Sequence, residues 1–77
     1  MQMVDFELRG EFIPLDALLK ATGLASSGGV AKMMIAAGEV FVDGEPESRK
    51  TRKIRAGQIV EAAGSRLHVT AGPPPPQ

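Results

Sequence analysis

Residues 26–55 read SSGGVAKMMIAAGEVFVDGEPESRKTRKIR. Three local signals follow one another in these residues without a break. Serines and glycines precede a short apolar run with helical spacing, a tight turn follows, and a dense basic run ends the stretch. We therefore expect a helix, a hairpin and a charged loop in this order.

The predicted helix begins at Ser26 or Ser27, because either hydroxyl can cap free backbone N–H groups. It ends at Gly38, a residue type that commonly takes the left-handed conformation after a helix. Gly28 and Lys32 lie on one face of this helix, which is left for another contact. The buried face is expected to carry Val30, Met33, Met34 and Ala37.

The hairpin follows directly. Residues 40–42 alternate in the manner of a strand with one buried face, and Phe41 is expected to face the core. Asp43 and Gly44 are a strong signal for a tight turn in which both positions need positive φ. Residues 45–47 form the return strand, placed at a sheet edge because their proline cannot donate to a strand ladder.

The segments before this stretch predict a strand and another helix. Residues 3–8 alternate apolar and acidic side chains, as a half-buried strand does. Residues 12–23 predict a first helix, with Pro14 in its first turn and Gly23 at its end. The face that packs against the second helix is expected to carry Leu15, Leu18 and Leu19.

The segments after it predict two further strands, at residues 59–62 and 66–70. Two short helices packed on a small antiparallel sheet make an α+β fold. We expect one domain, residues 1–71, followed by a disordered proline-rich tail at residues 72–77.

Charge is concentrated in residues 49–55, the basic segment, which holds five of the nine Lys and Arg residues of a chain with zero formal net charge. The remaining residues therefore carry four positive and nine negative side chains. A solvated charged loop is the plain interpretation of such a run. We favour an anion-binding role, because a cation cluster this dense in an otherwise acidic chain makes one face strongly positive.

Composition argues against an enzyme, a metal site and a membrane protein. Cysteine is absent, and the only histidine, His68, lies on a predicted strand without a carboxylate pair beside it. We therefore expect no catalytic residue, cofactor or metal. No apolar run approaches the roughly 20 residues that span a bilayer, and the amino terminus lacks a signal pattern. A cytoplasmic monomer is the expectation.

Aromatic content distinguishes between kinds of nucleic acid. The chain has no Trp or Tyr, and Phe6 and Phe12 lie in apolar contexts that indicate the core. Phe41 faces either the core, which we expect, or the ligand. Stacking on single-stranded bases needs exposed rings, so recognition of folded RNA by shape and backbone is favoured. Duplex DNA is disfavoured, because neither predicted helix carries a row of Arg, Asn or Gln that could read bases.

The start of the second helix could receive a phosphate. Its first N–H groups are unpaired and carry partial positive charge, and Gly28 and Gly29 have no side chains to hold a sugar-phosphate backbone away. Lys32 adds a charge one turn later, and arginines of the basic segment can grip phosphate with two N–H groups. The alternative is that the two glycines only let the helices pack closely.

The order of these motifs resembles the S-four-type RNA-binding domain, or alpha-L motif, named after a small-subunit ribosomal protein. The resemblance covers about residues 13–63 and rests on two short helices, the hairpin G-E-V-F-V-D-G, a basic crossing and A-G-Q-I-V-E. It is nearest to the small stand-alone bacterial members, through residues 27–32 (SGGVAK) and 47–50 (ESRK). Many members carry an arginine directly after the capping serine. Gly28 stands there in this chain, so that side-chain contact is absent.

This resemblance implies a non-enzymatic protein that docks folded RNA, with ribosomal RNA or a ribosomal particle as its host. The RNA-binding positions that it implies are Ser27, Gly28, Lys32, Asp43, Gly44, Arg49, Lys50, Arg52 and Lys53. One alternative is a protein-interaction module whose basic segment meets an acidic partner. Another is a small regulator that binds a phosphate-bearing small molecule at the helix start.

Overall fold

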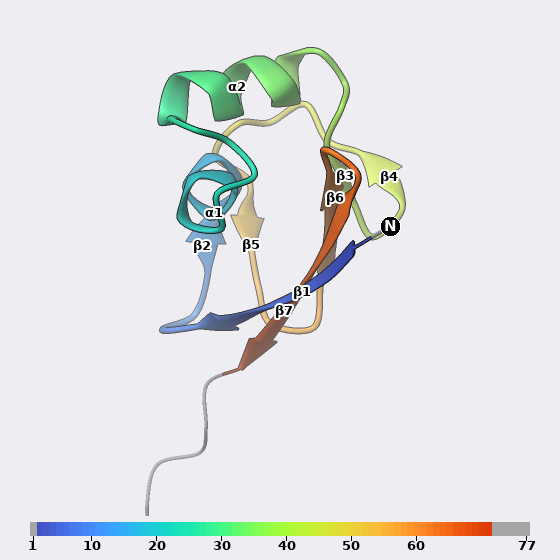
Figure 1. Cartoon of the computed structure of the whole chain (residues 1–77). Coiled ribbons are helices and arrows are strands. Elements are labelled where there is room, and N and C mark those ends of the chain that lie inside the picture. The colour runs from blue at the N-terminus through green and yellow to red at the C-terminus, as the bar shows by residue number, and fades with distance from the viewer. Residues whose placement is uncertain (1, 72–77) are drawn as a thin grey trace, which may run out of the picture.

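The computed structural model describes residues 2–71 and consists of two short helices packed on a small sheet (Figure 1). The predicted α+β class is confirmed. In chain order the elements are β1 (Gln2–Leu8), β2 (Ile13–Pro14), α1 (Leu15–Ala21), α2 (Gly28–Ala36), β3 (Phe41–Val42), β4 (Glu45–Pro46), β5 (Lys53–Ile54), β6 (Ile59–Ala62) and β7 (Ser65–Ala71).

The main sheet has five strands in the order β1-β7-β6-β3-β4. Its neighbours pair antiparallel, except that β1 runs parallel to β7 over its whole length, from Gln2 opposite Ser65 to Leu8 opposite Ala71. The sheet is therefore mixed rather than antiparallel throughout. Alternation of apolar and polar residues indicates which face of the sheet each side chain lies on, but not the direction of the neighbouring strand. The parallel pairing of β1 with β7 was therefore not predicted.

Helix α1 forms, but it is shorter than predicted. It spans Leu15–Ala21, and Pro14, expected in its first turn, is an extended N-cap residue that ends strand β2. This strand was missed, because proline suits both a helix start and an edge strand. Leu15, Leu18 and Leu19 are fully buried, and Gly23 follows the helix with a φ of +81°. The helix is short, so its stability depends on this packing rather than on its own propensity. Together with the inner faces of the strands, the three leucines form the centre of the core.

Helix α2 begins as predicted, but its buried face was predicted incorrectly. Ser27 is the N-cap, and its hydroxyl oxygen accepts a hydrogen bond from the backbone N–H of Val30 at 3.2 Å. The fully buried residues are Ala31 and Ile35. Of the predicted face, Met34 is partly buried against the core, but Val30 is 37% exposed, Met33 is 72% exposed and Ala37 is exposed. The helix is therefore rotated by about one residue from the predicted orientation.

The connection between the helices sets this rotation. Ala25 is buried in the core, and its N–H donates to the carbonyl of Leu19 at 3.0 Å. This fixes the path of the chain into Ser27 before α2 begins. Two apolar stripes with the same helical spacing, one residue apart, were available in the sequence. The connection selects the one that contains Ala31 and Ile35.

The hairpin between β3 and β4 has the predicted turn, with φ of +52° at Asp43 and +86° at Gly44. The Asp43 carboxylate also ties the hairpin to the next strand. It accepts hydrogen bonds from the N–H of Ile59 at 3.0 Å and from the side-chain amide of Gln58 at 3.1 Å. These bonds, with the nearby charge of Arg52, hold the pKa of Asp43 below its ordinary value of 3.8.

Two of the three phenylalanines do not lie in the core, contrary to prediction. Phe6 is partly buried against it, but Phe12 is 38% exposed and Phe41 is 37% exposed. Phe41 points outward because Val40 and Val42, its neighbours on either side, are both buried. Phe12 lies in the connection from β1 to β2, outside the alternation of a strand.

The predicted proline-rich tail, residues 72–77, lies outside the described residues. Within residues 2–71, neither helix has the length and apolar character needed to cross a membrane.

The observed orientation of α2 leads to a stability prediction. Ile35→Ala should lower the free energy of unfolding by about 2–5 kcal/mol, because it leaves a cavity in the core. Met33→Ala, in the same helix, should change it by no more than about 0.5 kcal/mol. Urea denaturation followed by circular dichroism measures both. A larger loss for Met33→Ala would favour the face predicted from the sequence.

The Asp43 hydrogen bonds lead to a pH prediction. Because the folded-state pKa is lowered, the stabilisation is present above the unfolded-state value near 3.8 and is lost as the pH falls through the folded value. At neutral pH, Asp43→Asn should therefore melt at a lower temperature than the wild type. This difference should shrink below about pH 4. A constant difference in Tm from pH 7 to acid would contradict the charge-dependent role.

Candidate nucleic-acid interface

The backbone of the basic segment is held by the first turn of α1. The N–H of Leu15 donates to the carbonyl of Arg52 at 2.9 Å, and the N–H of Asp16 donates to the carbonyl of Lys50 at 3.0 Å. The first N–H groups of a helix have no partner within the helix, and here the basic segment supplies two. The carbonyls of Lys50 and Arg52 therefore point toward α1.

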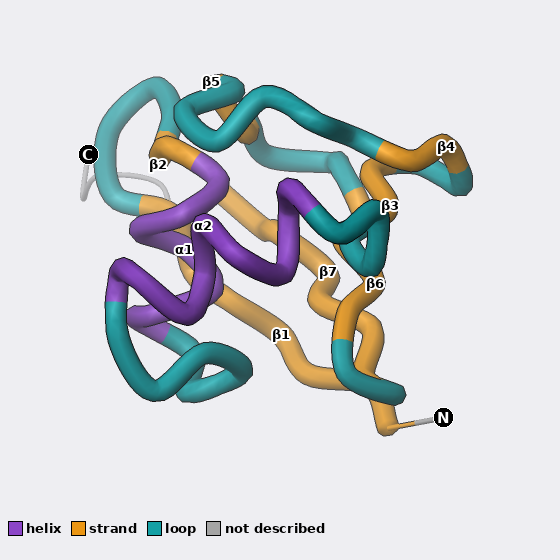
Figure 2. The backbone as a smooth tube through the Cα atoms, turned by 90° about the horizontal axis from the view of Figure 1, so that it is seen from above, coloured by secondary structure: helices purple, strands orange, loops and turns teal. Residues whose placement is uncertain are grey.

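A short strand pairing fixes the other end of the segment. In β5, Ile54 lies opposite Ile13 and Lys53 lies opposite Pro14 of β2. Ile54 is fully buried whereas Lys53 is exposed. Figure 2 shows the connection from β4 running the length of the molecule to β5, alongside the helices. This crossing is anchored at several points rather than free in solvent.

One buried carboxylate organises the two arginines. Glu47 is only 8% exposed, and its Oε1 atom lies 3.4 Å from both Arg49 Nε and Arg52 Nη1. Its own N–H donates to the carbonyl of Val40 at 3.0 Å, which fixes its position beside the hairpin. Sequence reasoning placed Glu47 in a return strand and assigned it no role in the site. The feature of the sequence that could have indicated this role is the position of Glu47, a carboxylate two residues before the basic segment.

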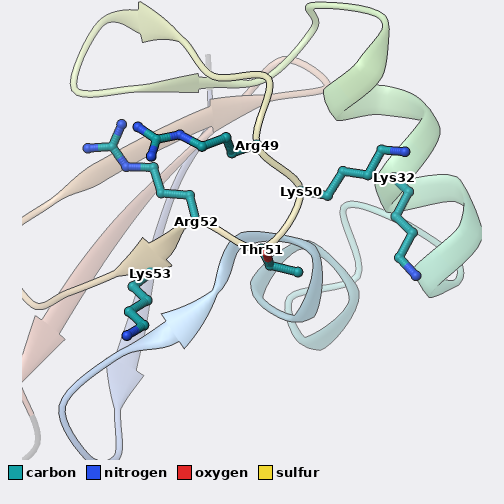
Figure 3. Close-up of a pocket in the computed structure, with 6 residues that line it drawn as sticks. All are labelled: Lys32, Arg49, Lys50, Thr51, Arg52 and Lys53. Atoms are coloured by element: carbon teal, nitrogen blue, oxygen red, sulfur yellow. The ribbon is translucent and has the colours of Figure 1, made fainter.

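Cations from α2 and from the basic segment line one groove, which we call the basic groove. Figure 3 shows its lining residues, with Arg49 and Arg52 pointing to one side and Lys50 reaching toward the helix that carries Lys32. The guanidinium groups keep further N–H donors beyond the bond to Glu47, and the Arg49 side chain is 79% exposed. The groove is lined by Lys32, Arg49, Lys50, Thr51, Arg52 and Lys53.

The start of α2 is open where the sequence suggested a close approach. A Cβ atom added at Gly28 would meet no neighbouring atom within 4 Å, and one at Gly29 would meet only the Ser27 hydroxyl oxygen at 3.8 Å. The two glycines are therefore not required for close packing between the helices, which was the alternative interpretation. The space over Ser27 and Gly28 remains accessible.

Asp43 and Gly44 are placed differently from the other predicted positions. Both lie at the tip of the hairpin and outside the lining of the basic groove. The Asp43 carboxylate is engaged with Gln58 and Ile59. Of the nine predicted positions, the structure thus brings five together in the groove, which are Lys32, Arg49, Lys50, Arg52 and Lys53. Ser27 and Gly28 begin the helix that supplies Lys32.

Comparison with known protein families identifies the domain. A sequence model described as "S4 domain" matches residues 6–70, which is most of the chain. The match includes both helices, the hairpin and the whole basic segment.

Two bacterial relatives are similar over most of their length. The chain is 49% identical over 59 residues to the "Putative RNA-binding protein YbcJ" of Escherichia coli (strain K12), covering 77% of this chain and 84% of the relative. It is 41% identical over 54 residues to the "Probable ribosome maturation protein RlbA" of Bacillus subtilis (strain 168), covering 70% of this chain and 76% of the relative.

A solved structure shares the fold. The solution structure of YbcJ from E. coli superposes with a TM-score of 0.66 at 42% identity, covering 92% of this chain and 89% of that one. It is described as revealing an alfaL motif involved in RNA-binding. The superposition covers most of both chains and the family model most of this one, and the chain belongs to the S4 domain family.

Proposed function

We propose that this protein binds structured RNA through the basic groove, without catalysing a reaction, and that the RNA is ribosomal or part of a ribosomal particle. One observation carries the proposal. Lys32 of α2 joins four cations of the basic segment in the lining of a single groove, in a chain with no net charge. Folding has gathered these positive charges on one surface.

The geometry suits a sugar-phosphate backbone. Arg49 and Arg52 are oriented by Glu47, and arginine can grip a phosphate with two parallel N–H groups. Lys32 and Lys50 supply point charges from the opposite side of the groove. Because the segment's backbone is already bonded to α1, little loop ordering has to accompany binding.

The names of the relatives support RNA over other polyanions. One is named as an RNA-binding protein and another as a ribosome maturation protein. The groove residues are cations and one threonine, a set that binds anions rather than one that arranges an acid beside a base. Recognition by shape and backbone is the mode that fits folded RNA.

The first test is binding of a labelled ribosomal RNA hairpin, measured by fluorescence anisotropy at several salt concentrations. The variant with Arg49, Lys50, Arg52 and Lys53 all changed to Gln should lose most of its affinity. For the wild type, five neutralised phosphates would give a slope of log K against log salt no steeper than roughly −4 to −5. The variant's slope should be much shallower, because fewer counterions are released.

Two single variants provide a matched comparison. Lys32→Gln removes a helix lysine that lines the groove, and Lys20→Gln removes an exposed helix lysine that does not. Only Lys32→Gln should weaken RNA binding. Circular dichroism should show both variants folded. Equal effects of the two changes would mean that net charge, not the basic groove, determines affinity, and absence of wild-type binding at low salt would exclude bare RNA as the ligand.

The ribosomal assignment is tested separately by sedimentation of cell extract through a sucrose gradient. We expect the wild-type protein to migrate with a ribosomal subunit or its precursor, and the four-Gln variant to remain at the top. If the wild type also remained at the top while still binding the hairpin, its RNA would be one outside ribosomal particles.

A further inference from the structure

An exposed aromatic ring lies at the end of the basic segment. Phe12 is 38% exposed, and its ring has the Lys53 ammonium 4.9 Å from its centroid and the Arg55 guanidinium carbon 5.9 Å away. Both cations lie over the ring. The two cations over the ring distinguish Phe12 from an isolated apolar residue at the surface.

The ring is continuous with the basic groove. Lys53 lines the groove and also contacts Phe12, so a single residue belongs to both. On its other side, Phe12 lines a smaller hollow together with Phe6, Glu7 and Arg9. Strands β2 and β5 lie side by side (Figure 1), and this pairing holds Phe12, which precedes β2, near Lys53 of β5.

The other exposed phenylalanine has the opposite surroundings. Phe41 is 37% exposed, and the hollow that it lines contains Glu39 and Glu61. Exposure of the residue is thus nearly equal at the two positions, but two cations lie over the Phe12 ring, whereas carboxylates line the hollow beside Phe41. Only the Phe12 ring combines a stacking surface with groups that attract phosphate.

We propose that Phe12 stacks on an unpaired base of the bound RNA, next to the helical part held in the basic groove, while Lys53 and Arg55 contact the adjoining phosphates. The inference rests on the proposed function and narrows its substrate class. The preferred RNA is a folded RNA in which a paired region continues directly into unpaired nucleotides.

The neighbouring cations do not prevent stacking. Lys53 and Arg55 are both exposed, so their long side chains can leave the ring without a packing loss in the core. A nucleotide supplies a base for the ring and a phosphate for each displaced cation. In the free protein the cation–π contacts keep ring and cations together.

Two hairpins test the proposal by anisotropy. One is blunt, and the other has the same stem with a short unpaired extension, added at the 5′ end or at the 3′ end. The wild type should prefer one of the extended forms. Phe12→Ala should bind that form about 5- to 100-fold more weakly, the range expected for loss of one stacked base, and bind the blunt hairpin as the wild type does. Phe41→Ala should match the wild type on both.

Fluorescence gives a direct readout, because the natural chain has no Trp or Tyr. In Phe12→Trp, the single indole should be quenched by the extended hairpin and much less by the blunt one. Phe41→Trp, at the equally exposed position, should show no such difference. Thermal unfolding checks that each variant is folded. If Phe12→Ala loses stability, Phe12→Trp still tests the proposal, because it keeps an aromatic ring at this position.

The outcomes separate this proposal from the one on which it rests. Wild-type binding of all hairpins with equal affinity, without quenching of Phe12→Trp, would overturn the stacking role and leave RNA binding intact. An equal loss on blunt and extended hairpins in Phe12→Ala would also overturn it. Failure of the wild type to bind any hairpin would remove the proposed function and, with it, the stacking role.

Discussion

The basic groove depends on the hydrogen bonds between the first turn of α1 and the carbonyls of the basic segment. Leu15 and Asp16 supply N–H groups that need partners, and Arg52 and Lys50 supply the oxygens. The carbonyls of Lys50 and Arg52 face α1, while the charged side chains of the same residues line the basic groove. A helix end that would otherwise be unsatisfied thus becomes the support for a row of cations. Because these bonds occupy N–H groups at the start of α1, those groups are not available to an anion. The accessible helix start is that of α2.

Electrostatic repulsion within such a row has to be compensated. The buried carboxylate of Glu47 lies 3.4 Å from both arginines, and at 8% exposure it is screened less by water than a surface pair would be. It offsets part of the repulsion and limits the rotamers of the arginines. The remaining acidic residues are distributed over other parts of the chain, which accounts for a neutral protein with one positive surface. Such a charge distribution orients the molecule as it approaches a polyanion.

The sequence predicted what depends on neighbours along the chain. The Ser27 cap, the leucine face of α1 and the Asp43-Gly44 turn each follow from local chemistry and are present. The face of α2, the parallel direction of β1 and the exposure of Phe12 and Phe41 depend on tertiary placement, and these were missed. For the site, the cations were identified from their density. Glu47 was not identified, because its role depends on a tertiary contact, the hydrogen bond of its N–H to the carbonyl of Val40 beside the hairpin.

The parallel pairing of β1 with β7 has a consequence for synthesis of the chain. In the sheet β7 lies between β1 and β6, although it follows both of them in sequence. While the chain is being made, β1 has no strand beside it until residues 65–71 have left the ribosome. The contacts among the helices, the hairpin and the basic segment are shorter in sequence than the pairing of β1 with β7. Closure of the sheet brings together segments separated by most of the chain, which is the kind of contact that slows folding.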